Sequence, residues 1–274
     1  MSLFDAFRYD GKRVLVVGGA TGMGAAAAEL VRDAGAEVVV MDYAEITLSG
    51  VKAIKVNLAD VASIDAAIEE CGGKVDALFS CAGVADSTPG IEKINFLGHR
   101  HMIDRMLEKD MLPRGSAIGF ISSAAGLGWE ANLELLKELL ATPDVETGAK
   151  WFHDNGKADY FHTKQAVCAY VSAQAHPMLK RGIRINAICP GPTDTPLAQA
   201  NAEMWLTFGS DYRADVGIEA STPLEQAYPL VFLCSTAGAS INGITLISDA
   251  GYMSSGLTGS FPDATPVAQF LMAR

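Results

Sequence analysis

The chain has 274 residues, of which 49% are hydrophobic, and a formal net charge of −11. A chain of this length can bury one sizeable core, as in α/β domains that run past about 200 residues undivided. The acidic balance argues against a nucleic-acid partner, which requires a basic surface. No apolar run approaches the ~18 residues of a membrane-spanning helix, so no membrane association is expected.

Short apolar runs alternate with longer amphipathic stretches along the whole chain. We expect strands at 13–18, 37–41, 52–56, 75–83, 116–126, 182–192 and 243–251. We expect helices at 23–35, 61–72, 94–112, 160–180 and 223–235. Repeated β-α-β units with strands that are apolar throughout imply a parallel sheet covered on both faces. The sequence therefore predicts a single α/β domain over residues 1–274, with a Rossmann-type, doubly wound sheet in three layers.

The five cysteines form no C-x-x-C pair, and their odd number and wide spacing indicate reduced thiols. The first residues lack the charged start and apolar core of a signal peptide. We therefore expect a cytoplasmic protein. His99 and His101 point in different directions on the expected helix, and no acidic or cysteine cluster joins them, so no metal site is predicted.

The first expected strand runs directly into GGATGMG, residues 18–24, which opens the first expected helix. Glycines at 18, 22 and 24 permit a sharp turn, close approach of a pyrophosphate and tight packing of the helix on the sheet. Free N–H groups at the start of a helix bind anions. This position predicts a dinucleotide-binding loop.

Asp42 ends the second expected strand. A carboxylate there can accept hydrogen bonds from the adenosine ribose hydroxyls, and it repels a 2′-phosphate. No arginine follows Asp42, so the predicted cofactor is NAD rather than NADP.

Tyr160 and Lys164 lie at i and i+4, one helical turn apart. A phenol has a reference pKa of about 10, and a nearby cation favours its charged form. We interpret Tyr160 as a general acid or base whose pKa is lowered by the Lys164 ammonium.

Together these motifs resemble the short-chain dehydrogenase/reductase family over nearly the whole chain. The glycine loop has Val17 where the family usually has threonine, and Ser80-Cys81-Ala82-Gly83 replaces its Asn-Asn-Ala-Gly. Asn57, followed by Leu58, stands where an aspartate is frequent. The segment RINAICPGPTDTPL matches the family's Asn-to-Pro-Gly-x-x-x-Thr pattern.

The resemblance implies roles for particular residues. Lys164 would also hold the nicotinamide ribose, Ser123 would orient the substrate oxygen, and Asn95 would hold a water that links Lys164 to solvent. The catalytic residues would be Asn95, Ser123, Tyr160 and Lys164. The cofactor-binding residues would be Gly18, Thr21, Gly22, Met23, Gly24, Asp42, Asn57, Leu58, Cys81, Ala82, Gly83, Tyr160, Lys164, Pro190, Gly191, Thr193 and Thr195.

A long insert, at about 127–158, separates Ser123 from Tyr160. Its apolar residues recur with helical spacing and predict a helical hairpin: Trp129, Leu133, Leu136 and Leu140, then Val145, Ala149 and Phe152. Thr142 would cap the second helix, with Pro143 at its first position. The insert resembles the branch containing bacterial 3α-hydroxysteroid dehydrogenase/carbonyl reductase and coniferyl-alcohol dehydrogenase. It could form a subunit contact or a substrate wall, or pack only on its own domain.

The segment at about 196–222 is expected to form a lid, in which Met204, Trp205, Leu206 and Phe208 cover an apolar substrate. The predicted function is NAD-dependent interconversion of an apolar (hydroxysteroid, allylic or aromatic) alcohol and its carbonyl compound. The alternatives are a non-catalytic dinucleotide-binding sensor and an NAD-retaining lyase or epimerase on the same fold. The resemblance also implies a homo-oligomer, either a dimer or a tetramer.

Overall fold

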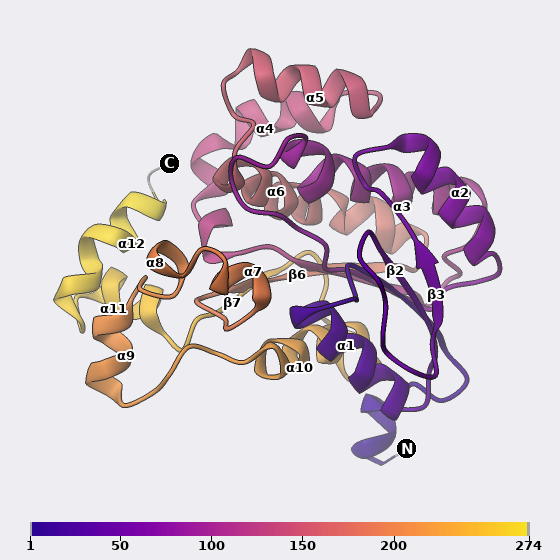
Figure 1. Cartoon of the computed structure of the whole chain (residues 1–274), viewed down its shortest axis with the longest axis horizontal. Helices are drawn as coiled ribbons and strands as arrows, with labels where there is room; N and C mark the ends of the chain where they lie inside the picture. The colour runs from indigo at the N-terminus through magenta and orange to yellow at the C-terminus, as the bar shows by residue number, and fades with distance from the viewer. Residues whose placement is uncertain (1, 273–274) are drawn as a thin grey trace.

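A computed structural model describes residues 2–272, in which seven parallel strands form one sheet (Figure 1). The sheet order is β3-β2-β1-β4-β5-β6-β7, so the strand order reverses between β1 and β4. This topology confirms the predicted doubly wound fold. The strands are β1 Arg13–Val17, β2 Glu37–Asp42, β3 Lys52–Lys55, β4 Ala77–Ser80, β5 Ala117–Ile121, β6 Arg184–Pro190 and β7 Thr245–Ser248.

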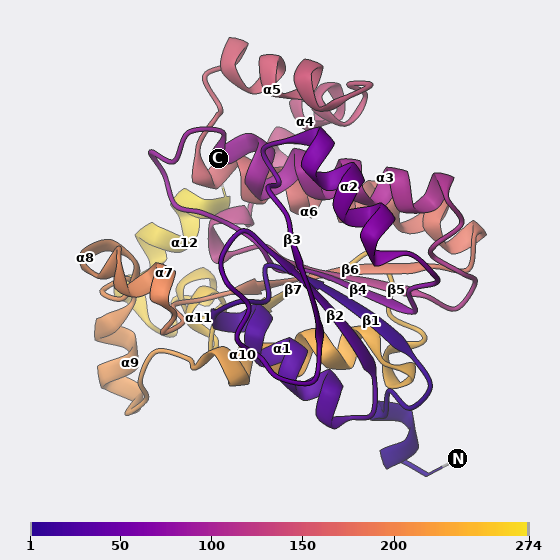
Figure 2. The same ribbon diagram turned by 45° about the vertical axis from the view of Figure 1, so that its right-hand side comes forward.

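Helices cover both faces of the sheet, because alternate side chains of each strand enter different cores. Val14 and Val16 pack with α1 (Gly22–Asp33) and α10 (Pro223–Cys234). Leu15 and Val17 belong to the opposite core. That core includes residues of α2, α3 and α6, which Figure 2 shows on the other side of the sheet. These helices span Val61–Cys71, Gly98–Glu108 and Tyr160–Lys180.

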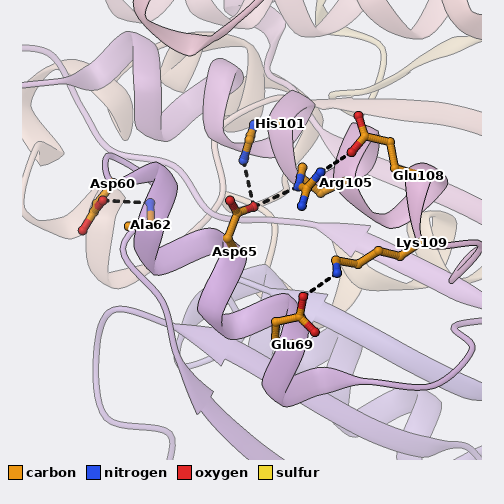
Figure 3. A network of polar contacts seen from close by, with 8 residues as sticks. All are labelled: Asp60, Ala62, Asp65, Glu69, His101, Arg105, Glu108 and Lys109. Carbon is orange, nitrogen blue, oxygen red and sulfur yellow. Dashed lines mark hydrogen bonds and ion pairs between the residues drawn. The ribbon is translucent and has the colours of Figure 1, made fainter.

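A polar network joins α2 to α3 on the outer surface (Figure 3). Asp65 accepts hydrogen bonds from His101 Nε2 at 3.1 Å and from Arg105 Nε at 3.2 Å. Lys109 pairs with Glu69 one helical turn further on. Such partly exposed pairs each contribute at most about 1 kcal/mol, so the buried core stabilises this helix pair more than the network does.

The insert forms two helices, α4 (Leu133–Leu140) and α5 (Val145–Asp154), as predicted. Figures 1 and 2 place both outside α6. Leu136 and Leu139, rather than the predicted Leu133 and Leu140, are the fully buried leucines of α4. They join the same core as α2, α3 and α6. The apolar face of the insert is therefore packed on its own domain.

The predicted cap of α5 is wrong by two residues. Asp144 is the N-cap and accepts a hydrogen bond from the Thr147 N–H at 2.7 Å, whereas Thr142 donates its hydroxyl to the Leu139 carbonyl. The turn is held by Arg100 of α3, whose guanidinium donates to Thr142 Oγ1 at 3.1 Å and to the carbonyls of Leu139 and Asp144. A buried arginine from another element thus contacts the turn between α4 and α5.

Several element ends differ from the predicted ranges. The expected helix at 94–112 begins as a π-helical turn at Lys93–Leu97, and α3 ends at Glu108. No helix or strand was predicted after residue 251, where α11 (Tyr252–Thr258) and α12 (Thr265–Met272) occur. The lid segment contains α7 Pro196–Gln199, α8 Ala202–Trp205 and α9 Ser210–Val216. Short 3-10 turns occupy Phe4–Phe7, Ala124–Gly126, Trp129–Asn132, Thr236–Gly238 and Pro262–Ala264.

The longest helix of the described residues is α6, at 21 residues. Neither it nor another helix within residues 2–272 combines the length and apolar character needed to cross a membrane.

Candidate active site

Two adjoining hollows lie where the strands end, next to the point at which the strand order reverses. This is where open α/β sheets bind ligands. The larger, of about 510 Å³, is lined by the glycine loop and the ends of β2 and β4, and is called the nucleotide hollow here. The smaller, of about 220 Å³, contains Ser123, Tyr160 and Lys164 and is called the catalytic hollow. Both are lined by Met23, Cys81, Gly83, Thr195 and Leu197.

The glycine loop leaves no room for side chains where it meets the next strand. Gly18 has φ +84°, and a Cβ there would lie 2.3 Å from the Ala82 nitrogen. A Cβ at Gly24 would lie 2.0 Å from the Gly18 carbonyl oxygen. Thr21, the N-cap of α1, makes no side-chain capping bond. The first N–H groups of α1 therefore face the hollow without a side-chain acceptor, which suits a pyrophosphate.

Asp42 fixes the glycine loop to the end of β2. Its Oδ2 accepts from the Ala20 N–H at 2.9 Å and its Oδ1 from the Ala44 N–H at 2.8 Å. Each carboxylate oxygen retains a further acceptor site. No lysine or arginine of the described chain lines the nucleotide hollow, whereas Asp42, Asn57 and Leu58 all do. These observations fit the adenosine side of a dinucleotide without a 2′-phosphate.

Ser123, Tyr160 and Lys164 converge from two elements. Ser123 follows β5 and caps a 3-10 turn by accepting from the Ala125 N–H at 3.1 Å. Tyr160 begins α6, which is capped by Asp159, and Lys164 lies one turn further along the helix. The Lys164 ammonium lies 5.5 Å from the centroid of the Tyr160 ring and donates to the Ile121 carbonyl at 3.1 Å. Both cation and phenol thus face the catalytic hollow.

Burial dominates the electrostatics of this pair. Burial raises the pKa of Tyr160 to about 12. A hydrogen bond with Ser123 opposes this shift, and the negative charge of Asp86 adds to it. Burial also lowers the pKa of Lys164 to about 8, against a smaller opposing effect of nearby thiols. The expectation that Lys164 brings the Tyr160 pKa toward neutrality is therefore not met by the groups of the chain itself.

Asn95 lies in the π-helical turn before α3 and lines neither hollow. Its Oδ1 accepts from the Val84 N–H at 2.8 Å, and its Nδ2 donates to the Val84 carbonyl and to Thr163 Oγ1. A Cβ at Gly83 would lie 3.3 Å from Lys164 Nζ and 3.5 Å from Asn95 Oδ1. Asn95 is therefore buried behind Gly83, on the side where Lys164 also lies.

The segment after β6 brings the remaining predicted residues to the catalytic hollow. Pro190, Gly191, Thr193 and Thr195 all line it. Thr195 caps α7 by accepting from the Ala198 N–H at 3.1 Å.

Three of the four predicted lid side chains also face this hollow, namely Met204, Trp205 and Phe208. The prediction for Leu206 was wrong, because its side chain does not line the hollow, and its carbonyl accepts from Arg213. The Trp205 ring lies 4.8 Å from that of Tyr160, centroid to centroid.

Among the residues that sequence reasoning missed, Asp86, Phe161, Leu271 and His99 shape the site. Asp86, Phe161 and Leu271 line the catalytic hollow. Asp86 also accepts from the Tyr160 N–H at 2.6 Å. His99 is buried and its Nε2 donates to the Ala82 carbonyl at 3.1 Å. The sequence carried no signal for Asp86 or Leu271, because neither belongs to a motif or an expected element.

No group of three or more His, Cys, Asp or Glu side chains within residues 2–272 is placed to hold a metal ion. The two histidines considered as metal ligands have other partners. His101 bonds Asp65 on the surface, and His99 is buried and bonds the Ala82 carbonyl.

Comparisons with known proteins agree with this geometry. Residues 12–133 match the family model described as short chain dehydrogenase, and residues 148–253 match the one described as Enoyl-(Acyl carrier protein) reductase. Coniferyl-alcohol dehydrogenase of Pseudomonas sp. is 29% identical over 252 residues, which are 89% of this chain and 97% of that protein. The 3-alpha-hydroxysteroid dehydrogenase/carbonyl reductase of Comamonas testosteroni is 29% identical over 87% of this chain and 95% of its own.

Among solved structures, a 3-alpha-hydroxysteroid dehydrogenase from Pseudomonas sp. B-0831, complexed with NADH, superposes with a TM-score of 0.72. It is 25% identical, and the match covers 91% of this chain and 99% of that one. The two family models together span every residue that lines the two hollows except Leu271.

Proposed function

The chain belongs to the short-chain dehydrogenase/reductase family, and within it we propose an NAD-dependent enzyme that interconverts an apolar alcohol and its carbonyl compound. The observation that carries this proposal is the position of Tyr160, Ser123 and Lys164 where the nucleotide hollow opens into an apolar one. A titratable proton donor next to a dinucleotide site is what alcohol–ketone interconversion requires.

Tyr160 would exchange the proton of the substrate oxygen. At neutral pH a phenol with a pKa of about 12 is protonated, so it is ready to donate to the alkoxide that forms when a ketone is reduced. A bound nicotinamide would supply or accept the hydride, and its positive oxidised ring would lower the pKa of a neighbouring phenol. Ser123 would bond the same substrate oxygen, and its bond to Tyr160 already favours the phenolate.

Lys164 would carry most of its positive charge at neutral pH, since its pKa is about 8. Its position behind Tyr160 would stabilise negative charge on the phenol and orient the nicotinamide ribose. Asn95 would hold the water that connects Lys164 to solvent. This relay is supported by the position of Asn95 Oδ1 and Lys164 Nζ on the same side of Gly83, where a single added Cβ would lie within 3.5 Å of both atoms.

Asp42 would select NAD, because its carboxylate would face the ribose hydroxyls and repel a 2′-phosphate. The remaining cofactor-binding residues predicted from the sequence all line one of the two hollows. The printed names of relatives include dehydrogenases of coniferyl alcohol and of hydroxysteroids, which agrees with an apolar alcohol as substrate.

A panel of secondary and allylic alcohols, assayed with NAD⁺ and with NADP⁺, tests this function. We expect alcohol-dependent formation of NADH and a preference for NAD⁺. If no alcohol gave net NADH and no carbonyl compound consumed it, the proposal would fall. Cytoplasmic location and assembly into a dimer or tetramer remain predictions, and light scattering of the purified chain tests the second.

A further inference from the structure

The C-terminal helix α12 contributes Leu271 to the catalytic hollow. This side chain is 4% exposed and lies in a small apolar core. The other buried members of that core are Ala124, Leu127, Cys168, Cys189, Met253 and Ala268. The hollow is thus bounded by the lid residues Trp205 and Phe208 and also by Leu271 of α12. Figure 1 shows α12 as the last helix of the chain.

Close backbone packing fixes the end of α12 in place. Gly128 has φ +74°, and a Cβ there would lie 2.0 Å from the Leu271 carbonyl oxygen and 2.8 Å from the Met272 Cα. Only glycine permits this approach. Leu271 also packs against Cys168 of α6 and Cys189 of β6, in the frame that carries Lys164 and the β6 loop. Leu271 is therefore part of this frame, against which the lid residue Phe208 also packs.

The space that Leu271 closes is small. The catalytic hollow has about 220 Å³, below the ~300–1,000 Å³ of sites for drug-sized ligands. Part of it lies against Gly191, Thr193 and Thr195, which would face the nicotinamide. Its lining is apolar except for a few groups, and Asp86 is the one carboxylate among the described lining residues. The space left suits a compact neutral molecule rather than a fused four-ring one.

We propose that Leu271 is a specificity-determining residue that limits the substrate to a compact neutral alcohol or ketone, of about one ring and a short side chain. This inference rests on the proposed function. It predicts that the wild-type enzyme oxidises cinnamyl alcohol or a similar single-ring alcohol with a higher kcat/KM than a 3α-hydroxysteroid.

Two opposite substitutions test the role of Leu271. Leu271→Ala should raise the ratio of kcat/KM for the steroid to that for the single-ring alcohol at least ~10-fold, in the range that a few methylene groups produce in apolar pockets. Leu271→Phe should lower the same ratio. Met272→Ala is the matched control, because Met272 is the next residue of α12, is 41% exposed and does not line the hollow. General destabilisation cannot move the ratio in both directions.

A second pair of variants, one that displaces the helix and one control, tests the same role without changing Leu271. Gly128→Ala should shift the ratio in the direction of Leu271→Ala. Gly156→Ala is the control and should leave the ratio unchanged, because Gly156 has a similar φ of +62° but no atom lies within 4 Å of the added Cβ. An unchanged ratio in both Leu271 variants, or a wild-type preference for the steroid, overturns the inference. Absence of all alcohol-dependent NADH formation in the wild type instead overturns the proposed function.

Discussion

The nucleotide hollow and the catalytic hollow share a wall, yet different kinds of element build them. Most of the nucleotide hollow comes from loops that directly follow strands, including Gly18 after β1, Asp42 at the end of β2 and Ala82 after β4. The catalytic hollow also uses the loops after β4, β5 and β6, but it adds residues of α6, of the short helices α7 and α8, and Leu271 of the C-terminal helix α12. The first is held almost entirely by the sheet, whereas part of the second depends on side-chain packing between segments far apart in sequence.

This difference suggests a division of tasks. A loop fixed by a sheet can hold the same cofactor with little freedom to vary, because added atoms collide with backbone, as at Gly24. Side chains such as Trp205 and Leu271 can change without moving the strands. We therefore expect changes at the strand ends to abolish cofactor binding or turnover, and changes in the later segment to alter substrate preference.

The largest effect is expected at the meeting point of the two hollows. Tyr160→Phe removes the proton donor but keeps the ring that contacts Trp205. We expect kcat to fall by about 10²–10⁴-fold, the usual contribution of general acid–base catalysis. NADH affinity, followed by nucleotide fluorescence, should stay within a few-fold of the wild type. Turnover close to that of the wild type would show that another group exchanges the proton.

The next effect is expected in the glycine loop. Gly24→Ala places a Cβ 2.0 Å from the Gly18 carbonyl, so the loop must move away from its neighbours. We expect cofactor affinity to fall on the order of 100-fold, or about 2.8 kcal/mol, as measured by titration calorimetry. Gly11→Ala is the control, since an added Cβ there meets nothing within 4 Å. Equal affinities for both variants would mean that this loop does not hold the cofactor.

A smaller effect is expected in the lid. Trp205→Ala removes the ring that lies against Tyr160, and aromatic pairs contribute about 0.5–1.5 kcal/mol beyond their buried area. We expect KM for an apolar alcohol to rise up to ~10-fold, with the KM for NAD⁺ unchanged. Trp205→Phe should restore most of the loss. A larger change in the KM for NAD⁺ than in that for the alcohol would place Trp205 with the nucleotide hollow instead.

The smallest effect on turnover is expected at His99, which supports Ala82 from inside the core. Burial, rather than the smaller effect of the Lys164 charge, is the main reason that the pKa of His99 falls to about 4, and the bond to Ala82 opposes it. Nε2 donates to a carbonyl, so Nδ1, which has no partner, would have to carry the added proton.

The pH dependence of stability follows from this shift. Between pH 6.5 and about 4 the unfolded chain binds a proton at His99 that the folded chain does not, so stability falls as pH falls through this window. By pH 4.5 the loss should reach about 2–3 kcal/mol. His99→Gln should remove that part of the pH dependence in urea unfolding, whereas His101→Gln on the surface should not. Parallel pH profiles for wild type and His99→Gln would refute the shift.

The features that could be predicted from the sequence are mostly those held by the sheet, and the features that could not be predicted depend on packing between distant segments. The doubly wound parallel sheet, the glycine loop and Asp42 were predictable because buried strands and their end loops leave local patterns. The Tyr160–Lys164 pair was predictable because its i, i+4 spacing places both side chains on one helix face. Leu271 and Asp86 were not, because a helix from the chain's far end and a loop carboxylate reach the site only through tertiary packing. The cap of α5 was misplaced for a related reason, since Arg100 of another helix holds that turn.

The proposed function depends on hydride exchange between an alcohol and the nicotinamide, which isotope transfer follows at the reacting carbon. Wild-type protein would be incubated with NAD⁺ and a single-ring allylic alcohol that carries deuterium on the carbinol carbon. We expect the label to appear on NADH in proportion to the carbonyl compound formed. Label that is retained in the organic product without net NADH, or lost to water, would contradict it and would favour an NAD-retaining lyase or epimerase.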